Sequence, residues 1–107
     1  MFIEGTAKGY VDVIKGVHRK TLAVGDKSML IEFTLDEGAV LPLHSHPHEQ
    51  IGYLLSGELQ FTIGEEEHIA KTGDSWAIPG DVKHAVRVIK NAVVVEVFAP
   101  IREDYLD

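Results

Sequence analysis

The feature that most constrains this chain is a two-residue alternation of apolar and polar side chains, repeated in short runs. Residues 58–63 show it plainly, because Leu59, Phe61 and Ile63 are apolar and the residues between them are polar. Residues 28–36 follow the same alternation. Successive side chains of a β-strand point to opposite faces, so this period indicates strands with one buried face. Many such runs, separated by turns that contain glycine, predict an all-β sandwich or barrel.

The same signature recurs along the chain. Besides the two runs above, it predicts strands at residues 10–14, 18–24, 50–55, 68–71, 75–78, 85–89 and 92–98. Turns are expected at residues 56–57 and 90–91, and residues 64–67 are expected to form an exposed hairpin turn. No window has a sustained helical period, and only residues 101–106 could form a turn or two of helix.

Length, composition and charge narrow the class of protein. A chain of 107 residues fits one domain of common size, and we expect a single domain over residues 1–107. Cysteine is absent, which excludes a disulfide framework and a thiolate metal site. The first residues lack the features of a signal peptide, so a cytoplasmic protein is expected. The net charge of −7, without clusters of lysine and arginine, argues against nucleic acid and membranes as partners.

Histidines gather near the middle of the chain. On an extended strand His44 and His46 share a face, where their side chains would stand about 7 Å apart and could converge on one ion. Gln50 shares their parity, whereas Glu49 falls on the opposite face. Pro47 weakens this parity argument, because proline bends a strand. From these residues alone, a metal site and a polar surface loop are equally good interpretations.

Two segments around these residues resemble the two motifs of the cupin family. The first, residues 38–57, matches at Gly38, His44, His46, Gln50 and Gly57, with Gln50 where the family carries glutamate. The second, residues 73–84, matches at Gly73, Pro79 and His84, although the family often has glycine where Asp81 stands. The resemblance implies a double-stranded β-helix, the jelly-roll or cupin barrel of RmlC-like proteins. It also implies a homodimer that forms by adding N-terminal strands to the partner's sheet.

The same resemblance implies one divalent metal ion held by His44, His46, Gln50 and His84. Three imidazoles and one neutral oxygen suit zinc, nickel, iron, manganese or cobalt, and the sequence does not choose between them. Glu49 is the rival of Gln50 as the oxygen ligand, and His48 is expected at the rim of the site. Open coordination positions are expected as well, since the mouth of the barrel must admit a ligand.

A carboxylate interrupts the most apolar run of the sequence. Residues 92–99 carry apolar side chains on both faces, which predicts a strand that is buried on both sides, yet Glu96 lies in its middle. Burying an unpaired carboxylate costs several kcal/mol, so Glu96 needs a partner or a role at a ligand cavity. The alternatives are a structural ion pair, with Arg19, Arg87 or Arg102, and a functional group.

The end of this strand resembles a narrower group of cupins. Glu96, Phe98, Pro100 and Arg102 are spaced like the tail of the pectin-degradation cupins, which open the ring of unsaturated uronate monosaccharides. The resemblance implies that Glu96 is the acid/base group, that Phe98 lines the pocket and that Arg102 contacts substrate. Residues 16–20 resemble a segment that would place Arg19 near the cavity. Two departures are that Glu96 replaces aspartate and that the spacing from His46 to Gln50 is one residue shorter.

Three functions fit these features. The first is a metal-dependent enzyme that opens or isomerises a small carbohydrate acid, with Glu96 and Arg102 as catalytic residues and Phe98, Arg19 and Arg102 binding substrate. The second is an iron-dependent dioxygenase at the same site, and the third is a metal-binding or ligand-sensing module without turnover. Trp76 and Tyr53 are expected to fill the barrel or an interface.

Overall fold

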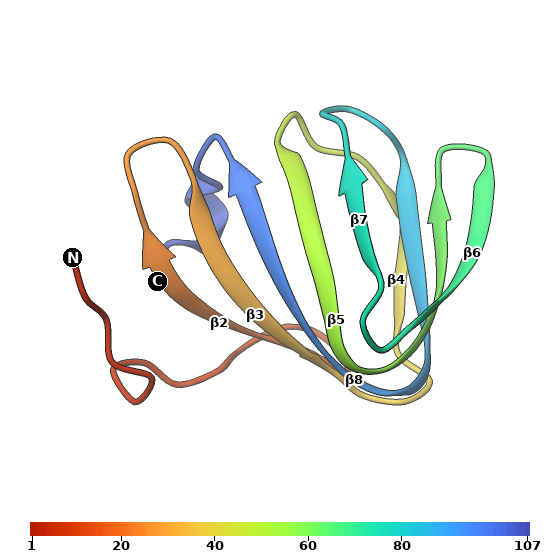
Figure 1. Cartoon of the computed structure of the whole chain (residues 1–107), viewed down its shortest axis with the longest axis horizontal. Coiled ribbons are helices and arrows are strands. Elements are labelled where there is room, and N and C mark those ends of the chain that lie inside the picture. Colours follow the sequence, from red (N-terminus) through yellow and green to blue (C-terminus); the bar gives the residue numbers. More distant parts are fainter.

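The computed structural model describes residues 1–107 as a barrel of β-strands (Figure 1). The elements in chain order are β1 (Val11–Ile14), β2 (Val17–Val24), β3 (Met29–Leu35), β4 (Val40–His44), β5 (Glu49–Ile63), β6 (Glu66–Lys71), β7 (Ser75–Ile78), β8 (His84–Ala99) and the 3-10 helix η1 (Glu103–Tyr105). The prediction of an all-β chain is confirmed. No helix is long and apolar enough to cross a membrane.

Two long strands, β5 and β8, each contribute to two sheets. Their halves near Gln50 and Phe98 pair with each other in a sheet of order β1-β2-β3-β8-β5-β7. Their other halves, near Phe61 and Val86, belong to a second sheet of order β4-β8-β5-β6. In Figure 1, β8 begins beside β4 and ends beside β3. This arrangement of antiparallel strands is the jelly roll that the resemblance of the two sequence motifs implied.

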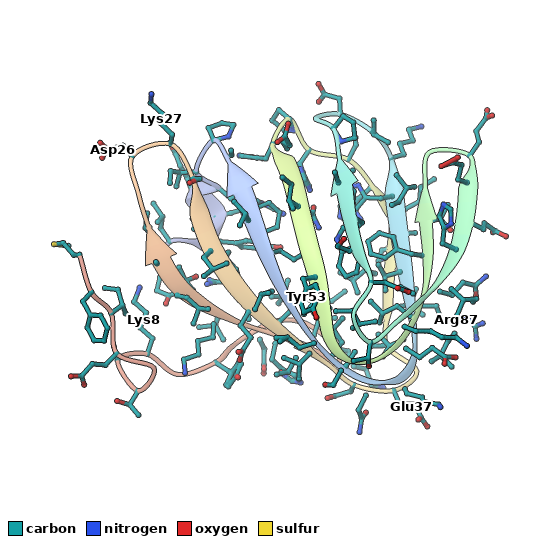
Figure 2. All side chains as sticks on the ribbon, viewed as in Figure 1. Lys8, Asp26, Lys27, Glu37, Tyr53 and Arg87 are labelled. Carbon is teal, nitrogen blue, oxygen red and sulfur yellow. The ribbon has the colours of Figure 1, made fainter.

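The core lies between the two sheets, where the inward-facing side chains meet (Figure 2). Fifteen buried apolar residues form one cluster. Ile31, Leu54 and Val94 are among its fully or almost fully buried members and come from β3, β5 and β8. Alternate residues of these strands face the core, as the two-residue period predicted.

The turns predicted at residues 56–57 and 90–91 are wrong, because β5 and β8 run through both positions. The pairing of the two strands shifts register between Leu54 and Leu59, which marks a bulge. Gly57 adopts φ 103°, and a β-carbon there would lie 2.4 Å from the carbonyl oxygen of Asn91. Glycine therefore bends a continuous strand from one sheet into the other instead of ending it.

The sequence also missed β4, whose side chains are mostly exposed and which contains Pro42. Its only pairing is with β8, and proline is tolerated on such an edge strand. The exposed turn expected at residues 64–67 is shorter than predicted, because β6 already begins at Glu66. The short helix expected within residues 101–106 is present as η1.

The segment after β8 folds back over one end of the barrel. The ring of Tyr105 packs edge-on against Phe33 and Phe98, with ring centroids 5.9 Å and 5.7 Å apart. Thr21 donates its hydroxyl to the backbone oxygen of Tyr105 (2.7 Å). These contacts bring Arg102 and Tyr105 to the wall of an internal cavity.

Candidate metal centre

Three histidines from separate parts of the fold meet at one end of the barrel. His44 ends β4, His84 begins β8, and the two residues are paired across these strands. His46 follows in the connection from β4 to β5. One ligand atom from each ring lies within 4.8 Å of the others. This spacing is small enough for one ion to reach all three.

The turn before β8 holds His46 beside His84. Gly80 passes so close to the preceding loop that a β-carbon there would lie 2.4 Å from the carbonyl oxygen of Pro47. Asp81 donates its backbone N–H to the backbone oxygen of His46 (2.8 Å). Asp81 adopts φ 68°, a left-handed conformation that glycine favours and aspartate tolerates. The two sequence motifs are therefore joined by direct backbone contact.

Backbone carbonyls fix the orientation of all three rings. A carbonyl oxygen only accepts, so each ring carries its proton on Nδ1 and leaves Nε2 as a lone pair. The Nδ1 acceptors are Pro42 O for His44 (2.7 Å), His48 O for His46 (3.1 Å) and Val82 O for His84 (2.9 Å). Nε2 of His84 is buried and has no hydrogen-bond partner. Such backbone support is what metal-binding histidines usually have.

Burial keeps two of these imidazoles neutral. Desolvation lowers the pKa of His84 to about 4, and it also lowers the pKa of His46, with a smaller contribution from the positive charge of Arg102. A histidine ligand binds a metal through its neutral form. The rings are thus in the protonation state that a metal requires at neutral pH.

Gln50 completes the group with an oxygen. Its side chain is buried, and Oε1 lies 2.9 Å from Nε2 of His46. With the ring proton on Nδ1, this contact joins two acceptors, and a cation between them would satisfy both. The amide nitrogen of Gln50 donates to Glu96, which fixes Oε1 toward the histidines. Glu49 is exposed, so the inward position at the start of β5 belongs to Gln50.

The donor set fits a divalent transition metal. Three imidazole nitrogens and one amide oxygen are donors that zinc, nickel, iron, manganese and cobalt all accept. His48 is not among the three histidines whose ligand atoms lie within 4.8 Å of one another, and its half-buried ring has its centroid 5.6 Å from that of His46. The expectation that His48 stands at the rim stays a prediction.

Glu96 is buried beside this centre without a cationic partner. None of the arginines considered as structural partners reaches it: Arg87 pairs with Gln60 at the periphery (Figure 2), Arg19 pairs with Asp107, and Arg102 pairs with Asp104. Two N–H groups donate to its Oε2 instead, from Gln50 and from Trp76. Burial raises the pKa of Glu96 to about 7, although both hydrogen bonds and, more weakly, the positive charge of Arg102 oppose the shift.

The cavity next to the centre has an aromatic and cationic wall. It is lined by His44, Gln50, His84 and Glu96 together with mainly apolar side chains. Phe98 is buried 5.8 Å from the ring of His46, measured between ring centroids. The guanidinium of Arg102 lies 5.0 Å from the centroid of the Phe98 ring and 4.0 Å from that of Tyr105. A ligand in this cavity would meet a carboxyl group, an arginine and an aromatic surface.

Arg19, in contrast, is not among the residues that line the cavity. Its buried guanidinium contacts Asp107 (2.6 Å), Thr21 (2.9 Å) and the backbone oxygen of Tyr105 (3.2 Å). It therefore ties the tail of the chain to β2. The structure brings the other predicted site residues together and leaves Arg19 behind Tyr105.

Sequence reasoning missed two residues of this cavity. Trp76 was expected to be filling or interface, and it also donates its indole N–H to Glu96 (3.2 Å). The sequence pattern indicates no role for Tyr105, because this residue follows the last predicted strand. The signal in the sequence is the pair of large aromatic residues Phe33 and Phe98, whose rings need a further apolar side chain to shield them from solvent at this end of the barrel.

Comparison with known proteins identifies the group to which this fold and site belong. The cupin domain family matches residues 31–99, a range that includes the three histidines, Gln50 and Glu96. The chain belongs to the cupin family. This cupin is 31% identical over 93 residues to the pectin degradation protein KdgF of Dickeya dadantii, covering 85% of this chain and 84% of that protein.

Solved structures agree with this assignment. The structure of KdgF from a Halomonas species superposes with a TM-score of 0.92 at 29% identity, covering 99% of this cupin and 98% of that chain. An RmlC-like cupin from Shewanella frigidimarina superposes with a TM-score of 0.92 at 27% identity, covering 98% of this cupin and 95% of that chain. The matches extend over nearly the whole length of each protein.

Proposed function

We propose that this cupin is a metal-dependent enzyme of pectin breakdown that opens the ring of an unsaturated uronate. The observation that carries the proposal is Glu96, a buried carboxyl group on the cavity wall that has no cationic partner and is hydrogen-bonded to Gln50. Burying this group carries a desolvation cost, which a role in proton transfer would explain in addition to its role in orienting Gln50. The similarity to pectin degradation proteins named KdgF supports the choice of substrate.

His44, His46, Gln50 and His84 would hold the metal, which when bound supplies a Lewis acid that polarises an oxygen of the substrate. Arg102 would bind the substrate carboxylate. It now pairs with Asp104, on an exposed side of the tail, and a carboxylate in the cavity would compete for the same guanidinium. Phe98 and Tyr105 would support the flat, unsaturated part of the sugar ring.

The proton balance assigns the chemistry to Glu96. It takes the proton of the anomeric hydroxyl as the C1–O5 bond breaks, and the electron pair of that bond goes to O5. The intermediates are an aldehyde at C1 and an enolate over O5, C5 and C4, while Glu96 carries the proton. Transfer of this proton from Glu96 to C4 converts the enolate to a ketone at C5, so the reaction is an isomerisation that needs no other reactant. A single acid/base group that can face both positions suffices.

The test is loss of the ultraviolet absorbance of the conjugated double bond in 4,5-unsaturated galacturonate and guluronate. The metal-loaded protein should consume the substrate, and Glu96→Gln should lower turnover by roughly 100- to 10,000-fold with metal content intact. Arg102→Ala should mainly raise KM. An unchanged absorbance with the metal-loaded parent would show that the substrate assignment is wrong.

We also propose that the chain forms a homodimer. The outer face of the first sheet exposes apolar side chains where β5 and β8 pair, with Ile51, Tyr53 and Val97 each between 37% and 48% exposed. β1 pairs only with β2, so one of its edges is open, and Val11 and Ile14 on it are exposed. Apolar surface beside an open edge is typical of interfaces between copies.

A further inference from the structure

Trp76 and Glu96 contact each other although another strand lies between their own. Trp76 is on β7, Glu96 is on β8, and Gly52 of β5 is the cross-strand neighbour of both. Two strand spacings amount to about 9.5 Å. The indole nitrogen nevertheless lies 3.2 Å from Oε2 of Glu96, so the Trp76 ring must cross over β5.

Gly52 is what makes this crossing possible. A β-carbon at this position would lie 2.2 Å from Nε1 of Trp76 and 2.3 Å from Cε2 of the same ring. The backbone of Gly52 is not in the left-handed region, so the requirement for glycine here comes from the ring and not from the turn of the chain. The indole therefore packs directly on the backbone of Gly52, in the space that a β-carbon would occupy. Phe61 packs against the ring, with centroids 4.9 Å apart.

The hydrogen bonds leave the two oxygens of Glu96 in different states. Trp76 and Gln50 both donate to Oε2. Oε1 accepts no hydrogen bond from the protein, and Glu96 lines the cavity. Hydrogen bonds from the protein thus hold Oε2, whereas Oε1 is free to contact a ligand in the cavity.

We propose that Trp76, seated on Gly52, is a positioning residue that holds Oε2 of Glu96 and keeps Oε1 directed at the ligand cavity. The part of the proposal that concerns proton transfer rests on the proposed function, because there Glu96 moves the proton. The orientation itself does not rest on it. Gln50 donates to the same oxygen, so this carboxyl group is fixed both by the candidate metal centre and by the indole.

The orientation is tested without substrate. Trp76 is the only tryptophan, so ¹⁵N-labelled protein gives one indole N–H resonance. Glu96→Leu and Gly52→Ala should each move this resonance upfield in the proton dimension, because the acceptor is removed or the ring is displaced. Ile31→Val, a change at the buried neighbour of Glu96 on β3, should leave it in place. A resonance that stays unmoved in Glu96→Leu overturns the proposal.

Kinetics test the consequence for proton transfer. In folded, metal-loaded protein, Trp76→Phe and Gly52→Ala should each lower kcat by roughly 10- to 150-fold, the usual worth of a hydrogen bond to a charged group, with little change in KM. The double variant should be no worse than Trp76→Phe alone, because both changes remove the same contact. An unchanged kcat in Trp76→Phe overturns the positioning role. If the parent has no turnover, the proposed function fails, and the resonance alone decides the orientation.

Discussion

At the scale of single residues, the candidate centre is built by hydrogen bonds that do not involve a metal. A hydrogen bond to a backbone carbonyl orients each histidine ring, and a hydrogen bond to Glu96 orients the side chain of Gln50. The donor atoms therefore lie close together, within 4.8 Å for the three histidines, before any ion binds. Preorganised ligands of this kind raise metal affinity, since the ordering of the side chains is already part of folding.

The first prediction concerns metal retention. His44→Ala and His84→Ala should each leave only a small fraction of the parent's metal after dialysis, because one of four donors is lost. Gln50→Ala should lose less, since a neutral amide oxygen is the poorest donor of the set. His68→Ala is the matched control, because the side chain of His68 is 57% exposed and belongs to β6, a strand that contributes no residue to the candidate centre. Metal content would be measured by elemental analysis, and equal content in all variants contradicts the site.

The second prediction concerns the stability cost of Glu96. Glu96→Gln should leave the melting temperature unchanged or raise it at neutral pH, because the amide avoids burying a charge and can still accept from Trp76. A structural ion pair would behave in the opposite way, and its loss would cost about 3 to 5 kcal/mol. A thermal melt of this single variant decides between the two, and a large destabilisation contradicts the cavity role.

Parity along a strand was enough to separate Gln50 from Glu49, because the structure places Gln50 inside and leaves Glu49 exposed. The same reasoning could not find the contact of Trp76 with Glu96. It depends on two strands that are neighbours only through β5, and on a glycine whose importance lies in the side chain that covers it. Sequence spacing predicts which face a residue occupies, not which distant residue it meets there.

At the scale of elements, the barrel depends on the bend in β5. Gly57→Ala should destabilise the fold by about 3 kcal/mol, because the new methyl group meets the backbone of Asn91 and Ala92 and the φ of 103° is unfavourable for alanine. Gly38→Ala is the control, since Gly38 has φ 85° with open space around its β-carbon position. Chemical denaturation of both variants separates clash from backbone strain, and equal losses would contradict the role of the close approach.

The bend also explains why strand limits were harder to predict than strands. Residues 56–57 and 90–91 have the composition of turns, yet each continues a strand through a bulge. A glycine at a bulge and a glycine in a turn share the same local preference for positive φ. Only the partner strand distinguishes the two, and that information is not local.

The pairing of β1 with β2 predicts a dependence of stability on pH. His18 lies between Asp12 (2.6 Å) and Asp36 (3.1 Å), while its other cross-strand neighbour, Thr34, carries no charge. The hydrogen bonds from Asp12 and then Asp36 raise the pKa of His18 above 6.5. The stabilisation is fully present below pH 6.5 and is lost as pH rises through the higher folded pKa.

Denaturation of the parent should therefore show stability falling as pH rises above 6.5 through the raised pKa of His18, and His18→Gln should remove this slope. The amide keeps the size of the imidazole but cannot gain a charge. Parallel slopes for parent and His18→Gln over this interval would mean that other groups set the dependence.

At the scale of the whole molecule, the cavity and the outer face of the first sheet use the same strands. In the halves of β5 and β8 that form this sheet, the inward-facing side chains include Gln50, Glu96 and Phe98. The outward-facing side chains of Ile51, Tyr53 and Val97 are apolar and exposed. Tyr53 marks this outer face in Figure 2. A strand that carries apolar residues on both faces is expected where both faces are covered. A second copy of the chain would provide the cover.

The last prediction follows from that face. In a two-fold dimer the same patch meets itself, so one substitution changes both sides of the interface. Tyr53→Lys should shift the mass measured by light scattering after size exclusion from two chains to one, because it places two ammonium groups in an apolar contact. Ile69→Lys is the matched control, since Ile69 is 50% exposed on β6 of the other sheet and should leave the dimer intact. A parent that elutes as one chain would show that there is no dimer, and a Tyr53→Lys variant that still elutes as two chains would show that the contact lies elsewhere. The histidines of the candidate centre all come from one chain, so metal should be retained in either state.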